Sequence, residues 1–264
     1  MRQTAVVSGS SLLHLMPLAD YESADPLIRP SSLESQGFAH CSPDISATTA
    51  VANLLYRGTD GPMVAVALDP DALSAPVRWE AADPAPPPGV PDGTLFPHVY
   101  GPIEKSAVTE VHHARRDVDG TFLALEPRPT TAEELDLLPH PEGGWYRQTW
   151  RGSATVHPGT PQERPSATAI YFLLPPGQSS AWHVVASDEL WFWHRGGPLT
   201  LSLGGRGETP TETGSVVLGA GPGEAGQGIV PAGTWQRADA SATSETLVSC
   251  VVSPGFDFAD FRTA

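Results

Sequence analysis

The chain has 264 residues, 40% of them hydrophobic, which is enough for one large domain or two of ordinary size. Its formal net charge of −15 would repel a phosphate backbone, so the composition excludes nucleic acid as an expected partner. The N-terminus has no sustained apolar run, which predicts neither a signal peptide nor a membrane span, and we expect a cytoplasmic protein. Cys41 and Cys250 predict buried, reduced thiols rather than a disulfide framework.

The first half of the chain combines short strands with one clear helix. A helix is predicted between an N-cap at Ser42 and a stop at Gly58. Its expected buried face carries Ala47, Val51, Leu54 and Leu55. Apolar runs predict strands around it at 11–16, 38–41, 63–68, 77–80 and 107–111.

The second half is predicted to be almost entirely β. Residues 126–134 are polar and rich in proline, which is typical of a linker, and Thr130 or Thr131 can cap a short helix there. Six or more short strands at regular spacing follow, which favours a barrel or a jelly roll. We therefore expect an α+β domain over 1–125, a linker over 126–134 and an all-β domain over 135–264.

The stretch from Gly177 to Gly196 holds the strongest candidate site. If His183 and Val185 share one face of a strand, Glu189 can return to the same interior from the next strand. An imidazole and a carboxylate would then meet in the mouth of a barrel, where ligand pockets are common. The carboxylate can orient the imidazole, which makes His183 the expected general base and Glu189 its orienting partner. A purely structural pair is the alternative.

The same stretch resembles the cupin superfamily. The spacing G-x5-H…E-x6-G at 177–196 and the Pro-x-Gly at 231–233 match its two signatures. More narrowly, HPEGGWYRQTW, SSAWHVVASDELWFW and LVSCVVSPGFDFADF resemble cupin family 5, a branch similar to dTDP-sugar epimerases. The resemblance implies a double-stranded β-helix (a jelly roll) and a homodimer formed through this domain. By family position it adds Glu142, Arg147 and Ser180 to the expected substrate-binding residues.

The metal ligands expected of a cupin are only partly present. Where a typical metal cupin has three histidines and a glutamate, this chain has His183, Val185, Glu189 and Gln236. Two good ligands, His183 and Glu189, with the Gln236 amide would form a weak site for a divalent metal. The alternative is a metal-free pocket in which Gln236 is a polar contact to the substrate.

Tryptophans are concentrated around the candidate site. Strand alternation places Trp191 and Trp193 alongside Glu189, and Trp182 and Trp235 are close in sequence to the same motifs. Such a wall would suit a sugar ring or a flat base, although tryptophans inside a barrel are often plain core. Arg147 could hold a carboxylate or phosphate by a bidentate contact or form a salt bridge at the rim.

The first half has a resemblance of its own. GFAHCS at 37–42, VANLLYRG at 51–58 and FPHVYGPI at 96–103 resemble a bacterial family of unknown function, number 952. This implies an α+β fold similar to the ADP-ribosyltransferases, which hold NAD in a cleft. By position, His14 would bind ribose, His40 and Ser42 would line the cleft, and His98 and Tyr100 would lie on its far side. The chain has no clear transferase glutamate motif, so a cleft that binds a nucleotide or nothing is the alternative.

Three functions remain open from the sequence. The first is an isomerase or epimerase that moves a proton on a small polar, sugar-like or nucleotide-linked substrate, with His183 as base and no required cofactor. The second is a metabolite-binding protein without chemistry. The third is a metal-dependent oxygenase or lyase. NAD or another nucleotide in the N-terminal cleft is a separate expectation, and neither nucleic acid nor a membrane is expected as a partner.

Overall fold

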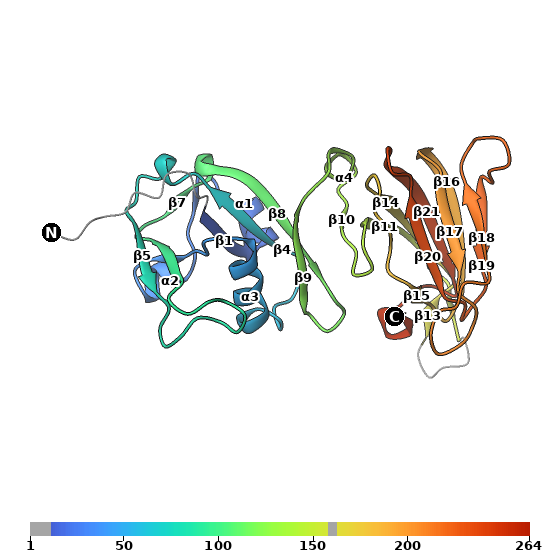
Figure 1. Ribbon diagram of the computed structural model, residues 1–264, viewed down its shortest axis with the longest axis horizontal. Helices are drawn as coiled ribbons and strands as arrows, with labels where there is room; N and C mark the ends of the chain where they lie inside the picture. Colours follow the sequence, from blue (N-terminus) through green and yellow to red (C-terminus); the bar gives the residue numbers. More distant parts are fainter. Residues whose placement is uncertain (1–11, 158–162) are drawn as a thin grey trace. The chain divides into compact units, whose positions relative to one another are not determined.

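A computed structural model of the protein describes residues 12–157 and 163–264. The chain divides into two compact units. Unit 1 is Met1–Arg128 and unit 2 is Pro129–Ala264. Figure 1 shows unit 1 in blue to green and unit 2 in green to red. Ser11, where the first strand was predicted to begin, lies outside the described residues. No helix in the described part is long and apolar enough to cross a membrane.

Unit 1 is an α+β unit in which strands outnumber helices. Its sheets have the orders β1-β4-β8-β9, β3-β6-β5 and β2-β7. The elements in chain order are β1 (Leu12–Pro17), α1 (Leu18–Ser23), β2 (Leu27–Ile28), α2 (Ser32–Ser35), β3 (Ala39–His40), α3 (Ile45–Leu55), β4 (Met63–Leu68), β5 (Val77–Ala81), β6 (Leu95–Val99), β7 (Ile103–Glu104), β8 (Val108–Arg116) and β9 (Phe122–Pro127).

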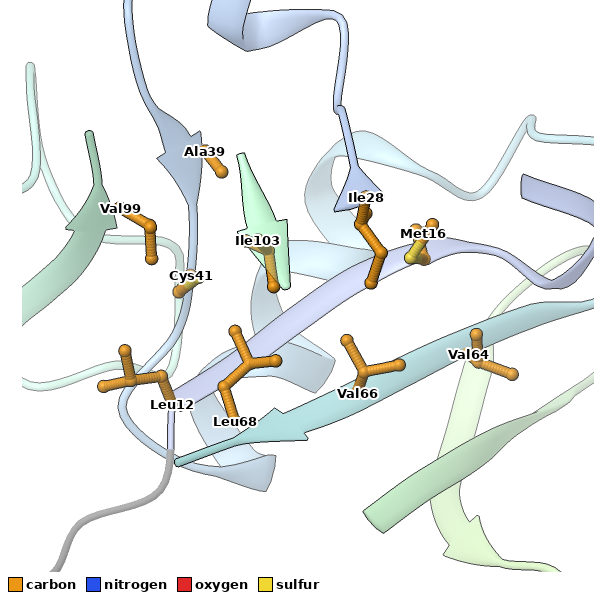
Figure 2. Close-up of a cluster of buried hydrophobic side chains, with 10 residues drawn as sticks. All are labelled: Leu12, Met16, Ile28, Ala39, Cys41, Val64, Val66, Leu68, Val99 and Ile103. Atoms are coloured by element: carbon orange, nitrogen blue, oxygen red, sulfur yellow. The ribbon is translucent and has the colours of Figure 1, made fainter. Parts of the chain in front are cut away.

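Strands β1 and β4 are buried on both faces, which explains their continuous apolar sequences. Side chains alternate between two hydrophobic clusters, because successive residues of a strand point to opposite faces. Val64, Val66 and Leu68 join the cluster of Figure 2, which also takes residues from β2, β3, β6 and β7. Met63, Ala65 and Ala67 join the opposite cluster, which includes Ala52 of α3.

The predicted face of α3 was wrong. Ala47 is buried as predicted, but Thr48 and Ala52 complete the buried face, whereas Leu54 and Leu55 are more than half exposed. The rotation is explained by a contact with β9, because the Asn53 side chain exchanges two hydrogen bonds of 2.8 and 3.0 Å with the backbone of Phe122. The N-cap is also different: the Asp44 carboxylate, not Ser42, accepts a hydrogen bond from the Ala47 N–H.

Unit 2 is a jelly roll of two facing sheets. Their orders are β10-β11-β14-β21-β16-β19 and β18-β17-β20-β15-β22, and β12-β13 form a small separate pair. The elements are α4 (Thr130–Glu134), β10 (Leu138–Pro139), β11 (Trp145–Arg151), β12 (Thr155–Val156), β13 (Arg164–Pro165), β14 (Thr168–Leu174), β15 (His183–Val184), β16 (Asp188–Gly196), β17 (Leu199–Leu203), β18 (Gly214–Leu218), β19 (Gln227–Val230), β20 (Gln236–Ala240), β21 (Thr246–Ser253) and β22 (Arg262–Thr263).

The segment 126–134 is more ordered than a linker. Glu126 pairs in register with His113 inside the β8–β9 ladder. The helix predicted after Thr130 is present as α4, and its Ala132 is fully buried in a cluster with Leu137 and Trp145. Only Arg128 and Pro129 lie between β9 and α4. The boundary between the two units, at Arg128 and Pro129, falls inside the segment predicted as a linker, and β9 and α4 take up the rest of it.

The core of unit 2 takes side chains from both of its sheets. Phe172, Trp191 and Val248 come from the six-stranded sheet, and Leu199 and Leu201 come from the five-stranded sheet. All five are 1% exposed or less. This packed layer fills one part of the space between the sheets and leaves another part for the candidate site.

We predict that Gly196→Ala lowers the free energy of unfolding of unit 2 by about 1–3 kcal/mol. Gly196 has φ +101°, and a Cβ there would collide with the backbone carbonyl of Glu245. Urea unfolding followed by tryptophan fluorescence measures the effect, because six of the seven tryptophans lie in unit 2. Gly214→Ala is the matched control, since nothing lies within 4 Å of its Cβ position. Equal stabilities of the two variants would contradict the prediction.

Candidate functional site

A cavity of about 280 Å³ lies within unit 2. It combines two histidines and two glutamates with a largely aromatic wall. The residues that line it are His140, Glu142, Tyr146, Gln148, Thr168, Ile170, Phe172, His183, Val185, Glu189, Cys250, Val252, Phe256, Phe258 and Phe261. His183 and Glu189, predicted to converge from neighbouring strands, both line this cavity and are 2% and 6% exposed.

The His183 ring is held through one of its two nitrogens. Its Nδ1 lies 3.0 Å from the carbonyl oxygen of Ala181 and 3.1 Å from Oε2 of Glu142. A carbonyl oxygen can only accept, so Nδ1 carries the proton in this hydrogen bond. In the neutral ring, Nε2 then bears the lone pair. His183 is therefore set up as a base, with Glu142 as the carboxylate beside its Nδ1.

A tight turn brings Glu142 to His183. The backbone N–H of Ala181 donates to the Glu142 carbonyl at 2.6 Å, which ties the turn to the segment before β15. Gly143 follows in a left-handed conformation, and a Cβ there would lie 2.8 Å from the Ser179 carbonyl oxygen. Because only glycine fits this approach, the Glu-Gly sequence places the carboxylate against the imidazole. His140 lies in the same turn, with its Nδ1 3.7 Å from Oε2 of Glu142.

Glu189 has separate partners. Nε2 of Gln236 donates to its Oε2 at 2.5 Å, and the Cys250 thiol is also hydrogen-bonded to it. The Trp191 indole N–H donates to Oε1 of Gln236 at 2.9 Å, which fixes the orientation of the amide. Glu189 was predicted to orient His183, but the carboxylate in contact with Nδ1 is that of Glu142. Gln236 lies between the two groups, since it faces His183 in the β15–β20 register.

Burial acts on the two groups in opposite directions, because it always disfavours the charged form. It lowers the pKa of His183 to about 4, against the raising effect of the Ala181 hydrogen bond. It raises the pKa of Glu189 to about 7, against the lowering effects of Gln236 and Cys250. Near neutral pH the cavity therefore presents an uncharged imidazole and a carboxyl group that gains and loses its proton readily.

The predicted donor set does not fit a first-row metal. Val185 occupies the position of a second histidine, and it lines the cavity with an apolar side chain. Both ends of the Gln236 amide are already engaged, its oxygen by Trp191 and its nitrogen by Glu189. Within residues 12–157 and 163–264, no group of three or more His, Cys, Asp or Glu side chains is placed to hold a metal ion.

Several predicted pocket residues lie elsewhere. The Ser180 hydroxyl is buried and accepts a hydrogen bond from the Ala238 N–H, which ties the segment before β15 to β20. Arg147 is exposed and donates to the carbonyl of Leu135. Trp191 belongs to the hydrophobic core and Trp193 packs against it, and neither lines the cavity. The side chains predicted to face the interior do so, but interior positions of β16 contribute to the hydrophobic core as well as to the cavity.

The aromatic wall of the cavity is made of phenylalanines that the site prediction missed. Phe256, Phe258 and Phe261 come from the segment after β21, and Phe261 lies over His183 with a centroid distance of 5.8 Å. Strand β22, which ends this segment, pairs with β15 at His183. The sequence signal was the aromatic run GFDFADF at the end of the chain, which a strand pattern alone does not connect to His183.

In unit 1, four of the five predicted cleft residues gather around one sheet. His40 and His98 are register partners in the β3–β6 pair, with ring centroids 5.1 Å apart. Tyr100 and His98 both hydrogen-bond to the Glu80 carboxylate. His14 is buried, and its Nδ1 donates to the His40 carbonyl at 2.8 Å. Ser42 is a buried backbone bridge to Leu13 rather than a member of this group.

Comparisons with known proteins match each unit to a family. Residues 130–264 match the model of "Cupin superfamily (DUF985)", and residues 16–111 match "Protein of unknown function (DUF952)". A search of curated proteins finds no match.

Similar solved structures include a hypothetical protein from Leishmania major, which is 36% identical in sequence. The match covers 50% of this chain and 83% of the Leishmania chain, with a TM-score of 0.45. A protein from Shewanella oneidensis has 34% identity, coverage of 51% and 82%, and a TM-score of 0.45. A Klebsiella pneumoniae protein with a double-stranded β-helix domain has 19% identity, coverage of 53% and 98%, and a TM-score of 0.35.

We predict that Glu189→Gln removes a pH-dependent penalty on stability. Between the usual pKa of 4.5 and the folded value of about 7, the folded protein holds a proton that the unfolded chain has lost. The stability contributed by this group therefore falls as pH rises through that window. Relative to the variant, the wild type should lose about 1.4 kcal/mol per pH unit between about pH 5 and about pH 7.

Urea unfolding of both proteins across this window measures the difference. The opposite contribution of His183, whose folded pKa is lowered to about 4, raises stability as pH rises toward 6.5. It is present in both proteins and cancels in the subtraction. A difference that is independent of pH would contradict the buried environment assigned to Glu189.

Proposed function

Since this chain belongs to the cupin superfamily (DUF985), a fold family that includes enzymes and binding proteins, we propose that its cavity catalyses proton transfer on a small polar metabolite. The reaction class is isomerisation or epimerisation beside a carbonyl group. The observation that supports it is the pairing, in one cavity, of an imidazole held through Nδ1 with a carboxyl group in a separate environment.

The proposed step uses the two groups as base and acid. Nε2 of His183 takes a proton from the carbon beside the carbonyl, and the electron pair of the broken C–H bond forms a carbon–carbon double bond. The carbonyl π electrons move onto oxygen, which takes the proton of the Glu189 carboxyl group and becomes an enol. Return of a proton to the other face of the same carbon, as the enol O–H gives its proton back to Glu189, yields the epimer. Where that carbon carries a hydroxyl group, the hydroxyl gives its proton to Glu189 as the former carbonyl carbon is protonated, which yields the isomer.

Glu142 has a positioning role in this proposal. Its Oε2, 3.1 Å from Nδ1, keeps the ring in one tautomer and stabilises the imidazolium that forms when Nε2 accepts a proton. Glu189 suits the acid role because a pKa near the working pH allows both donation and recovery of the proton. His183 suits the base role because burial keeps it uncharged.

We expect wild-type protein to catalyse exchange of carbon-bound hydrogen for deuterium in at least one member of a panel of small ketoses, keto acids and amino ketones. The loss of exchange in His183→Ala should be roughly 10²–10⁴-fold. Proton NMR in D₂O measures the rate, and the melting temperature checks the fold. His194→Ala is the control, because His194 is exposed and does not line the cavity. Wild-type exchange rates in His183→Ala would rule out the base assignment.

A metabolite-binding protein without chemistry is the second candidate for unit 2, and the same panel separates it from the enzyme. Binding of a compound without exchange at any of its carbons favours this alternative. The aromatic wall of the cavity supports this alternative, because aromatic rings can hold a ligand without any reaction taking place. Substitution of His183 would then change affinity alone.

For unit 1 we propose nucleotide binding on the face that carries His40, His98 and Tyr100. Support comes from the Phe38 ring, whose centroid lies 4.2 Å from that of His98 and 5.3 Å from that of Tyr100. Partly exposed rings of this kind can stack on a base. The Arg78 guanidinium lies 4.2 Å from the Tyr100 ring centre and is exposed, which suits a phosphate.

Calorimetry of the full chain with NAD, ADP-ribose and a nucleoside phosphate tests this second proposal. We expect heat with at least one of them, and a loss of affinity in His98→Ala. His157→Ala is the control, because His157 is 71% exposed and lies in unit 2. An absence of heat with all three compounds would rule out nucleotide binding by this face.

A further inference from the structure

A hydrogen-bonded chain of three side chains runs from the hydrophobic core of unit 2 to the cavity. Glu189 and Trp191 are two residues apart on β16, so both face the interior of the unit. Gln236 comes from β20, in the other sheet, and is hydrogen-bonded to both of them. Gln236 is fully buried, and Trp191 and Glu189 are 1% and 6% exposed. A single buried amide therefore joins the carboxyl group of the cavity to the core.

The direction of this chain is set at its core end. An indole N–H can donate a hydrogen bond but cannot accept one, so the amide atom 2.9 Å from the Trp191 nitrogen has to be the oxygen of Gln236. The amide nitrogen then faces Glu189 and donates to its Oε2 at 2.5 Å. A reversed amide would place two buried N–H donors against each other at Trp191, which is unfavourable. Trp191 thus selects one of the two orientations of the amide.

This orientation makes the two oxygens of Glu189 unequal. In a protonated carboxyl group the C=O oxygen is the better acceptor, because the other oxygen uses one of its positions to hold the proton. Oε2 already accepts the amide N–H, which favours it as the C=O oxygen and leaves the proton to Oε1. With a reversed amide, the oxygen of Gln236 would face Oε2 and would accept the carboxyl proton there.

We propose that Trp191 is a positioning residue that, through Gln236, keeps Oε2 of Glu189 as the accepting oxygen and Oε1 as the oxygen that carries the transferable proton. This deepens the proposed function and rests on it for the acid role of Glu189. In that reaction Oε1 gives its proton to the carbonyl oxygen of the substrate and recovers it from the enol. A reversed amide would hold the same proton away from the substrate.

Several other titratable groups share the cavity with Glu189. They are His140, Glu142, Tyr146, His183 and Cys250. The Cys250 thiol is hydrogen-bonded to Glu189, and Cys250 also faces Trp191 in the β16–β21 register. His183 faces Gln236 in the β15–β20 register. A change at Trp191 could therefore reach Glu189 either through Gln236 or through Cys250, and the two routes need separate variants.

Trp191→Phe removes the indole donor and keeps an aromatic ring in the core. The Gln236 amide is then free to turn, and an amide oxygen facing Glu189 favours the protonated carboxyl group. We expect the pKa of Glu189, about 7 in the wild type, to rise by about 1–2 pH units, the effect of losing a hydrogen bond to a charged group. Titration of the Glu189 ¹³C carboxyl resonance, assigned with Glu189→Gln, measures this in the full chain.

Trp193→Phe is the matched control for this substitution. Trp193 lies two residues further along β16 and packs against the same core cluster, but its indole N–H donates to the carbonyl of Gly197. The pKa of Glu189 should keep its wild-type value in this variant. An unchanged or lower pKa in Trp191→Phe, or an equal rise in both variants, would overturn the proposal.

Gln236→Met tests the middle of the chain. It replaces the amide by an unbranched apolar side chain, so Glu189 loses its N–H donor and its pKa should also rise. In this background Trp191→Phe should have no further effect, whereas an effect that passes through Cys250 would persist and would overturn the role of Gln236. If Trp191→Phe does not fold, the absence of a rise in Gln236→Met alone overturns the proposal.

Infrared spectroscopy tests which oxygen of Glu189 holds the proton. At a pH below its titration, the C=O stretch of the protonated group can be identified by its loss in Glu189→Gln. This band should move to higher frequency in Gln236→Met, because a C=O group that loses an N–H donor has a stiffer bond. An unchanged frequency would show that Gln236 does not bond to the C=O oxygen, which would overturn the assignment of the proton to Oε1.

These measurements need no substrate, so the positioning role and the proposed reaction can fail separately. If the reaction alone is wrong, no compound of the substrate panel exchanges hydrogen, but the titration of Glu189 still shifts in Trp191→Phe and Gln236→Met. If the positioning role alone is wrong, hydrogen exchange still depends on His183, whereas the titration of Glu189 does not respond to Trp191→Phe.

Discussion

The His183 Nδ1–H donates to the Ala181 carbonyl with the Glu142 carboxylate 3.1 Å from the same nitrogen, and the candidate site depends on this pair of contacts. It selects the ring nitrogen that carries the proton and leaves the other as a base. It also joins two parts of unit 2 that are far apart in sequence, the turn at Glu142 and the strand β15. Gly143 makes this approach sterically possible. The geometry of the base is thus a consequence of a backbone conformation forty residues away.

The second constraint is the exclusion of water from a site that contains ionisable groups. Burial lowers the pKa of the imidazole and raises that of the Glu189 carboxyl, which moves both groups toward their uncharged forms. Gln236, itself held by Trp191, donates to the Glu189 carboxyl, and the phenylalanines of the C-terminal segment line the same cavity. The site therefore combines rigid support with an apolar wall, an arrangement that suits acid–base chemistry.

Much of this could be predicted from the sequence, and the failures have physical causes. The spacing of His183 and Glu189 between Gly177 and Gly196 predicted correctly that both face one interior, because strand alternation is a local property. The role of Glu142 and the phenylalanine wall depend on contacts between distant segments, which periodicity does not contain. Trp191 points inward as predicted, yet the facing sheet fills that position with core residues.

The same distinction applies in unit 1. Strand β4 was predicted from its unbroken apolar sequence, and the same sequence accounts for its burial on both faces. The rotation of α3 was not, because two hydrogen bonds between Asn53 and the Phe122 backbone decide which face of the helix meets the sheet. At 126–134 composition predicted a linker, and the end of β9 and helix α4 occupy most of this stretch around the boundary between the units.

The most direct test of the central claim is the ¹⁵N NMR spectrum of the His183 ring, assigned by comparison with His183→Gln. The account predicts a neutral ring with its proton on Nδ1 and a lone pair on Nε2 at neutral pH, and the same state at about pH 5, since its pKa is lowered to about 4. A proton on Nε2 in the neutral ring, or an imidazolium already formed at about pH 5, would contradict it.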